Sequence, residues 1–478
     1  MLCCILLLGG CAVGPDYKRP DTVALDGYKE DVPTKIQEEG GVKWRPASPG
    51  VPDASAWWTS FNDPLLNEMM EALGQENQRI QSALANLRMA HAQVREARAS
   101  FFPALNTNMS RARGNDQHGF AETTYNAQLQ ANWELDLWGA TRRGVESQTA
   151  VAREEAANLG AVILSMRAEL ATNYFQLRTY DELIEYYDET IRAFTRSWQI
   201  TKDQQEAGIA TPADVARSLA QLRAAEAQAV NIALQRKKME HAIAVLLGKT
   251  PAEFSLSPAK LVAVIPDIEA GLPSDLLERR PDIAAAEMQV ASANAAIGVA
   301  KSAFFPVFSF SASGSFVHNS FSEWFTVPNR IWSVGPALAL NLFQGGAMSA
   351  RTDAAIAAWE RTVADYRQTV LHAVSEVEDN LAATRYLQRE EMLQTQAYEA
   401  SRRAEEILQN QYSVGIVGFL DVVLAQEATL DNARALSQTR GARFATAVAL
   451  IRALGGGWDT SGLHLTGEIE PVKTGEHE

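Results

Sequence analysis

Several short segments of the chain alternate apolar and polar residues with a period of two. Between 307 and 316, Phe308, Phe310 and Phe316 alternate with serines, and between 128 and 138, Leu129 and Trp133 alternate with polar residues. This period is typical of a β-strand with one apolar and one polar face. The sequence therefore predicts four strands, two within about 103–138 and two within about 306–343.

The segments between these strands are rich in alanine and predict helices. The first is expected to run from Asp63, a candidate N-cap followed by Pro64, to about Ala99. No proline interrupts residues 140–207 or 337–470. A helix of about 67 residues would be roughly 100 Å long, far beyond the usual length of about 11–12 residues. The alternative is that each segment breaks into two shorter helices.

The chain contains an internal repeat. Pro103 and Pro306 are 203 residues apart (306 − 103), within the similar strings ARASFFPAL and AKSAFFPVF. ELDLWG matches LNLFQGG, and EAGIATPADV matches YSVGIVGFLDV, in the same order. Three ordered matches favour a duplication over a coincidence of alanine-rich helices. The predicted domains are a signal peptide at 1–10, an irregular N-terminal segment at 11–61, repeat 1 at 62–248, a linker at 249–272, repeat 2 at 273–455 and a tail at 456–478.

The net charge of −15 and the absence of basic clusters argue against nucleic acid as a partner. The sequence contains no stretch of about 18 apolar residues, so no transmembrane helix is expected. The seven histidines are scattered without metal-binding spacing, and neither a GxSxG string nor a phosphate-binding glycine loop occurs. We therefore expect no enzyme, no metal and no cofactor.

All three cysteines lie at the start of the chain. Cys11 follows an apolar run and the residues LLGG, which suit signal cleavage and acylation of Cys11 with a diacylglycerol and an N-acyl chain. A signal peptide requires a basic residue before its apolar run, and no Lys or Arg precedes this one. The start codon could therefore lie upstream. The alternative is an ordinary buried N-terminal strand.

Strands of about 9–11 residues can span a bilayer, and an outward apolar face with an inward polar face is typical of a transmembrane barrel. Several aromatic residues could form the interfacial girdles: Trp133, Trp138, Phe321, Trp324, Phe325 and Trp332. A soluble half-buried sheet would also alternate. Four strands cannot close a barrel, because known barrels begin at about eight, so several chains would have to share one barrel.

The sequence resembles the TolC-like outer-membrane factors of efflux systems, in particular their NodT-type lipoprotein branch. The strings that carry the resemblance are LLGGC, CAVGPDY, WWTSFNDPLLNEMMEAL, WELDLWG, LPSDLLERRPDI, AFFPVFSF, LFQGG and YSVGIVGFLDV. The resemblance implies an α+β membrane protein: a homotrimer with a 12-stranded β-barrel, four strands per chain, continued by a long α-helical barrel into the periplasm. It also implies the cell outer membrane as location and contact with outer-membrane lipid.

By the same resemblance, the protein is expected to be a passive exit duct for drugs and other small toxic compounds. Its partners would be a periplasmic adaptor protein and an inner-membrane pump of the resistance-nodulation-division type. An exit duct for a type I protein secretion system is the alternative. A periplasmic adaptor lipoprotein is less compatible with the sequence, since an adaptor would carry one helical hairpin between small β-domains.

The resemblance further implies a gate at the periplasmic end, formed by Asp214, Tyr412 and Asp421. Tyr412 would bond a neighbouring helix near Asp214, and Asp421 of each chain would form an acidic ring. The alternative is that both aspartates only cap helices. Leu424 replaces a second aspartate of the family, so a second acidic ring is doubtful. Val417 replaces an arginine that some members carry in the gate network. Gln344 replaces a commoner aspartate.

Overall fold

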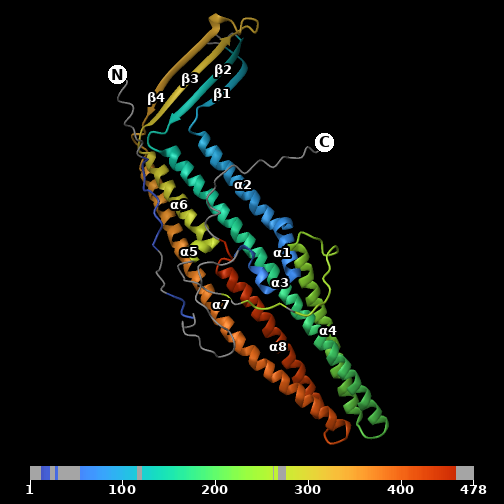
Figure 1. Cartoon of the computed structure of the whole chain (residues 1–478). Coiled ribbons are helices and arrows are strands. Elements are labelled where there is room, and N and C mark those ends of the chain that lie inside the picture. Colours follow the sequence, from blue (N-terminus) through green and yellow to red (C-terminus); the bar gives the residue numbers. More distant parts are fainter. Residues whose placement is uncertain are drawn as a thin grey trace.

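The chain forms one sheet with a set of long helices that extend away from it (Figure 1). The computed structural model describes residues 12–21, 27–30, 54–115, 121–261, 263–266, 268 and 276–458. Cys11 and the tail after 458 lie outside these residues. The sheet occupies one end of the molecule, and two tight turns between helices occupy the opposite end. The predicted combination of four strands with long helices is confirmed.

Matching elements recur in the same order in the two halves of the chain. α2 and α6 each contain 22 residues, α3 and α7 each contain 67, and α4 and α8 each contain 35. α3 and α7 are continuous, so the alternative of two shorter helices is wrong. The elements are η2 (Ala54–Phe61), α1 (Pro64–Glu76), α2 (Gln78–Ala99), β1 (Ala104–Asn115), β2 (Ala121–Leu135), α3 (Ala140–Glu206), α4 (Pro212–Leu246), α5 (Leu276–Arg279), α6 (Pro281–Ser302), β3 (Val307–His318), η4 (Val327–Asn329), β4 (Arg330–Ala339), α7 (Ala347–Ser413) and α8 (Phe419–Ala453).

The first predicted helix is interrupted at Asn77, which corrects the expectation of one helix to Ala99. Asn77 has an extended backbone, and its side-chain oxygen accepts the backbone N–H groups of Arg79 and Ile80 as the N-cap of α2. Its amide nitrogen donates to the carbonyl of Leu246 at 2.7 Å. The predicted cap at Asp63 is confirmed, with its carboxylate accepting the N–H groups of the first turn of α1.

The four strands form an antiparallel sheet in the order β1-β2-β3-β4. Directly opposite residues of neighbouring strands lie on the same face. The register therefore builds rows across the sheet with matched polarity. Leu105, Ala131, Ala312 and Val334 form one apolar row, whereas Asn106, Gln130, Ser313 and Ser333 form the adjacent polar row on the other face.

The ends of two strands differ from the prediction. β2 ends at Leu135 because Asp136 turns out of the strand and caps α3, accepting the backbone N–H groups of Thr141 and Arg142. β4 ends at Ala339, about four residues before the end expected from the sequence at about 343. Asp136 therefore belongs to the junction with the helices rather than to the polar face of the sheet.

The predicted aromatic residues gather near both ends of the sheet. At the helix end, Trp138 stacks on Phe305, and its indole N–H donates to the carbonyl of Pro306 at 2.7 Å. At the distal end, Trp324 lies against the rings of Tyr125 and other aromatic residues of the β3–β4 connection. Aromatic residues at both margins of an apolar band are typical of a membrane barrel.

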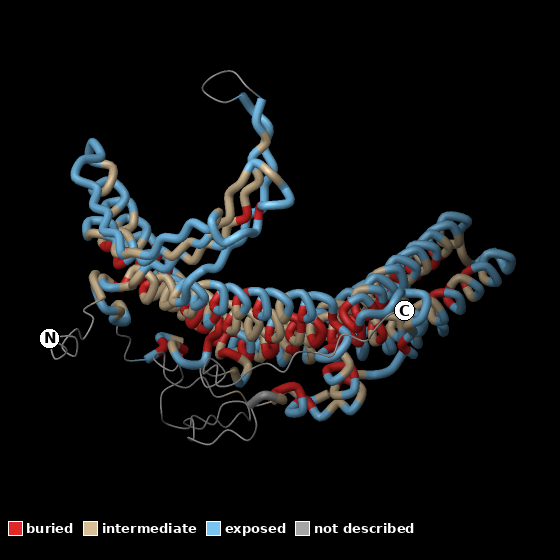
Figure 2. The backbone as a smooth tube through the Cα atoms, turned by 90° about the horizontal axis from the view of Figure 1, so that it is seen from above, coloured by how far each residue is buried: buried red, intermediate tan, exposed pale blue. Residues whose placement is uncertain are grey.

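The buried residues concentrate in the middle of the helices, whereas the strands are largely exposed (Figure 2). Phe61, which is fully buried, packs against Phe175 of α3 and Phe444 of α8. This core joins the start of the first repeat to helices of both repeats. α6 has the length and apolar composition of a membrane span, but it packs against α3 and α7 as part of the helix layer.

A buried ionic network attaches the linker between the repeats to α3 and α4. The Asp181 carboxylate accepts bonds from Arg178 at 2.9 Å and from Arg236 at 2.5 Å. The two guanidinium groups also donate to the linker carbonyls of Ser257 and Leu256. Because each buried charge has an opposite charge and further hydrogen bonds, the network fixes the linker without an unpaired ion.

The N-terminal segment lies along the helices just below the sheet. Val13 donates a backbone hydrogen bond to the carbonyl of Trp138 at 3.0 Å. Gly14 has a φ of +105°, and a Cβ atom there would lie 2.5 Å from Cα of Gly298, so only glycine fits. The buried guanidinium of Arg143 pairs with Asp16 at 2.8 Å. The described chain therefore begins beside the junction of sheet and helices.

Candidate functional site

The candidate site consists of the two turns at the end of the molecule opposite the sheet (Figure 1). The first turn joins α3 to α4, and the second joins α7 to α8. Gly208 and Gly415 take equivalent positions, with φ of +75° and +78°, which glycine adopts without strain. Asp214 and Asp421 each follow six residues later, so the duplication places one carboxylate at the start of each returning helix.

Both aspartates cap the helices that they begin. The Asp214 carboxylate accepts the Thr211 hydroxyl at 2.7 Å and the Thr211 backbone N–H at 3.1 Å. These two bonds hold the pKa of Asp214 below its usual range, the hydroxyl contributing most. The Asp421 carboxylate accepts the backbone N–H of Gly418 at 3.2 Å and is exposed. Capping is therefore what these groups do within one chain, and an acidic ring stays a prediction.

Tyr412 connects the two turns. Its hydroxyl donates to the Gln204 side-chain oxygen on α3 at 2.5 Å and lies 3.4 Å from the Thr201 hydroxyl. The ring is buried, 5.6 Å from the ring of Phe419, in an apolar cluster that also contains Val422. Tyr412 is thus a link between the hairpin of repeat 2 and the long helix of repeat 1.

The partner of Tyr412 is Gln204 rather than a residue at Asp214 itself. Sequence reasoning missed both Gln204 and Thr201. The only sequence signal is a stripe of polar residues at helical spacing near the end of α3, at 197, 201 and 204. In this structure Ser197 and Thr201 are buried, which sets this stripe apart from an ordinary solvated face.

Two residues that depart from the family pattern, Val417 and Leu424, lie in the second turn and near the start of α8. Val417 packs against the cluster around Tyr412, where an arginine would bring a charge. Leu424 is 56% exposed on α8. Three further apolar side chains at the turns are largely exposed: Ile209, Val414 and Ile416.

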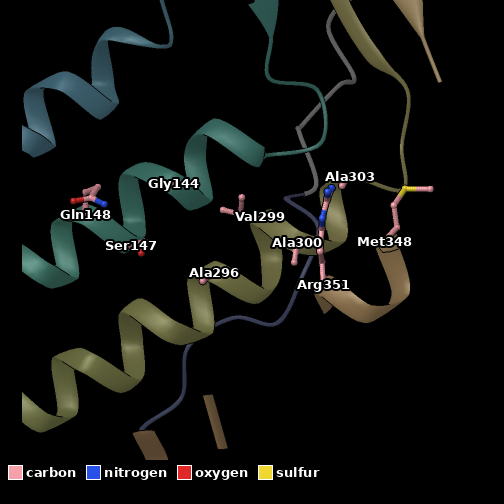
Figure 3. Close-up of a pocket in the computed structure, with 9 residues that line it drawn as sticks. All are labelled: Gly144, Ser147, Gln148, Ala296, Val299, Ala300, Ala303, Met348 and Arg351. Carbon is pink, nitrogen blue, oxygen red and sulfur yellow. The ribbon is translucent and has the colours of Figure 1, made fainter. Parts of the chain in front are cut away.

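A cavity of about 490 Å³ lies at the opposite end of the helices, near the sheet (Figure 3). It opens between the first turns of α3 and α7 and the last turns of α6, and Arg351 is its only charged lining residue. Because the cavity lies at the sheet end of the helices and the turns lie at the other end, the cavity is not part of the candidate site. Within the described ranges, no three His, Cys, Asp or Glu side chains gather in a way that could hold a metal ion.

The sheet, the long paired helices and the linked turns together define a class, the channel proteins of the bacterial outer membrane. The chain matches the outer membrane efflux protein family over residues 70–249 and 272–456, and it belongs to that family. It is therefore an outer-membrane exit channel and not an enzyme, and the resemblance to TolC-like factors is confirmed.

Individual relatives agree along almost the whole chain. The chain is 29% identical over 466 residues to the probable efflux pump outer membrane protein TtgC of Pseudomonas putida, covering 95% of this chain and 94% of TtgC. It is 28% identical over 432 residues to nodulation protein T of Rhizobium leguminosarum bv. trifolii, covering 88% and 89%. The solved structure of the outer-membrane channel OprN superposes with a TM-score of 0.83 at 32% identity, covering 94% of this chain and 100% of OprN.

Proposed function

We propose that three copies of the chain close one 12-stranded barrel, in which β1 of each chain pairs with β4 of the next. The observation that carries this proposal is a sheet with one apolar face, whose two edge strands pair with no further strand among the described residues. In lipid, each unpaired backbone group costs several kcal/mol, so the edges require partners.

The assembled barrel and helices form a passive exit duct for drugs and other small toxic compounds. Its inner strand face carries Asn, Gln and Ser side chains, which suit a water-filled passage. The duct receives its cargo from an inner-membrane pump of the resistance-nodulation-division type through a periplasmic adaptor. The exposed apolar residues Ile209, Val414 and Ile416 at the turns provide a surface for the adaptor.

Asp214, Tyr412 and Asp421 serve as the gate at the periplasmic end. The bond from Tyr412 to Gln204 ties the α7–α8 hairpin to α3 and favours a narrow end. Three exposed Asp421 carboxylates around a threefold axis would add an acidic ring. Leu424 supplies no charge at the position where the family often has a second aspartate.

Cys11 carries a diacylglycerol and an N-acyl chain that anchor the protein to the inner leaflet. The hydrogen bond from Val13 to Trp138 supports this proposal, because Val13 itself, two residues after Cys11 in the sequence, lies beside the sheet end of the helices. Labelled palmitate is expected to enter the wild-type protein and to be absent from Cys11→Ala. Equal labelling of the two proteins would reject lipidation at Cys11.

An exit duct for type I protein secretion is the second candidate, since the same passage would carry an unfolded polypeptide. Deletion of the coding sequence separates the two. We expect a deletion strain to accumulate a fluorescent drug several-fold above wild type and to recover with a plasmid copy. If drug accumulation is unchanged and a secreted polypeptide disappears from the medium, the secretion function is correct instead.

A further inference from the structure

Three arginines lie on the apolar face of the sheet toward its end away from the helices, two on the edge strand β1 and one on the opposite edge strand β4. Arg111 and Arg113 lie near the end of β1, two and four residues beyond Met109 on the same face. Arg330 begins β4 and stands opposite Phe316 of β3, again on that face. All three side chains are exposed. They are cations on the surface that faces lipid, not the interior of the duct.

These arginines have no carboxylate partner among the residues that the structure describes. The guanidinium of Arg111 lies 5.7 Å from the ring centre of Tyr125. The Glu323 carboxylate at the same end lies 3.7 Å from the imidazole Nε2 of His318. Three unpaired cations on a protein with a net charge of −15 indicate an anionic partner outside the chain.

The depth of the arginines identifies the layer that they face. On β2 the outward face runs from Leu135 to Tyr125, which is paired with Arg111, a separation of ten residues (135 − 125). Ten residues span about 34 Å along a strand, or about 26 Å along the membrane normal at a tilt of about 40°. The apolar band of outer-membrane barrels is about 25 Å tall. Arg111 therefore lies at the outer margin of this band, Arg113 lies two residues beyond it, and Arg330 lies two residues inside it, in the row of Ala127 and Phe316.

The neighbouring side chains suit an amphipathic ligand. Met109, below Arg111 and level with Arg330, and Trp332, below Arg330, are 69% and 68% exposed and face the hydrocarbon layer. Beside them, the rings of Phe321 and Trp324 pack with Tyr125 at the level where lipid head groups begin. Acyl chains would lie on the apolar strip while an anionic head group meets the guanidinium groups.

We propose that Arg111, Arg113 and Arg330 form a binding site for the phosphate groups of a phosphorylated glycolipid of the outer leaflet. Guanidinium groups bind phosphate oxygens in paired, charge-assisted hydrogen bonds. In the trimer proposed above, on which this step rests, Arg330 of one chain lies near Arg111 and Arg113 of the next. The lipid then seals the three seams between chains.

The test uses the full-length protein in detergent, titrated with hexa-acylated, bis-phosphorylated lipid A and followed by native mass spectrometry. A basic residue near an anionic membrane surface is worth about 1 kcal/mol, so loss of three predicts roughly 100-fold weaker binding. We expect this loss in the triple variant Arg111→Gln, Arg113→Gln, Arg330→Gln. The matched triple Arg→Lys variant keeps the charges and is expected to keep most of the affinity.

Three results would overturn the proposal. The Gln variant could bind lipid A as tightly as wild type, lipid A without its phosphates could bind equally well, or inorganic phosphate alone could stabilise the protein equally. The same spectra report the number of chains. A monomer that binds phosphorylated lipid would contradict both the trimer and a site shared between chains, and a trimer without this selectivity would contradict the site alone.

Discussion

Leu129→Arg is expected to abolish the assembled channel in the outer membrane. Leu129 lies on the apolar face of β2 and is 51% exposed, so its side chain contributes little to packing within the chain. An arginine facing lipid costs about 2–4 kcal/mol near the middle of the bilayer, and a trimer would carry three. We expect heat-stable oligomer in outer-membrane fractions to fall at least tenfold.

Gln130→Arg is the matched control, because the adjacent residue points to the opposite face. There the new charge meets water inside the duct, so assembly should proceed at wild-type yield while cation conductance falls. Equal yields of the Leu129 and Gln130 variants would contradict the assignment of the two faces. Loss of both variants would show that the strand tolerates no charge, and this also contradicts a water-filled interior.

Tyr412→Phe is expected to open the periplasmic end. The substitution removes the hydroxyl that bonds Gln204 while keeping the ring among its apolar neighbours. A neutral hydrogen bond contributes about 1 kcal/mol, and three chains acting together change the ratio of closed to open forms by roughly 100-fold. Single-channel conductance in planar bilayers should rise, and vancomycin should enter cells more readily.

Tyr386→Phe is the control for this variant, since Tyr386 is 64% exposed on α7, outside the cluster that links the turns. It should conduct as wild type does. Asp421→Asn tests the ring separately, because asparagine still caps the helix but carries no charge. Unchanged conductance and vancomycin entry in both Tyr412→Phe and Asp421→Asn would reject the gate.

The sheet can be predicted from the sequence, because apolar and polar residues alternate along each strand and so mark its two faces. Ser309 to Ser315 mark the polar face on every second residue, and the cross-strand rows extend this pattern over all four strands. The long helices α3 and α7 can also be predicted, because neither stretch of 67 residues contains a proline that would interrupt a helix. Both are local properties of the chain.

The points where these elements end are harder to predict, because they depend on contacts between residues that are distant in sequence. Asn77 interrupts the first helix while donating to Leu246, 169 residues away. Asp136 continues the polar alternation of β2 but caps α3 instead. A residue that fits a periodic pattern can still leave it when a tertiary partner satisfies the freed backbone groups.

The candidate site was predictable in part. The resemblance implied Asp214 and Asp421 as gate residues, and the duplication relates the two turns, since Gly208 and Gly415 each precede one of these aspartates by six residues. The pairing of Tyr412 with Gln204 joins residues 208 positions apart, and no spacing in a single sequence encodes such a contact. The polar stripe at 197, 201 and 204 on α3 indicates only that a polar group packs against this face, not which residue provides it.

The central claim is that each chain supplies one third of a closed wall with lipid outside and water inside. Single-particle imaging of the detergent-purified protein tests this claim most directly. The account predicts particles with threefold symmetry, one barrel per three chains and a long helical tube below it. A detergent-free monomer, or a barrel closed by a single chain, would contradict it.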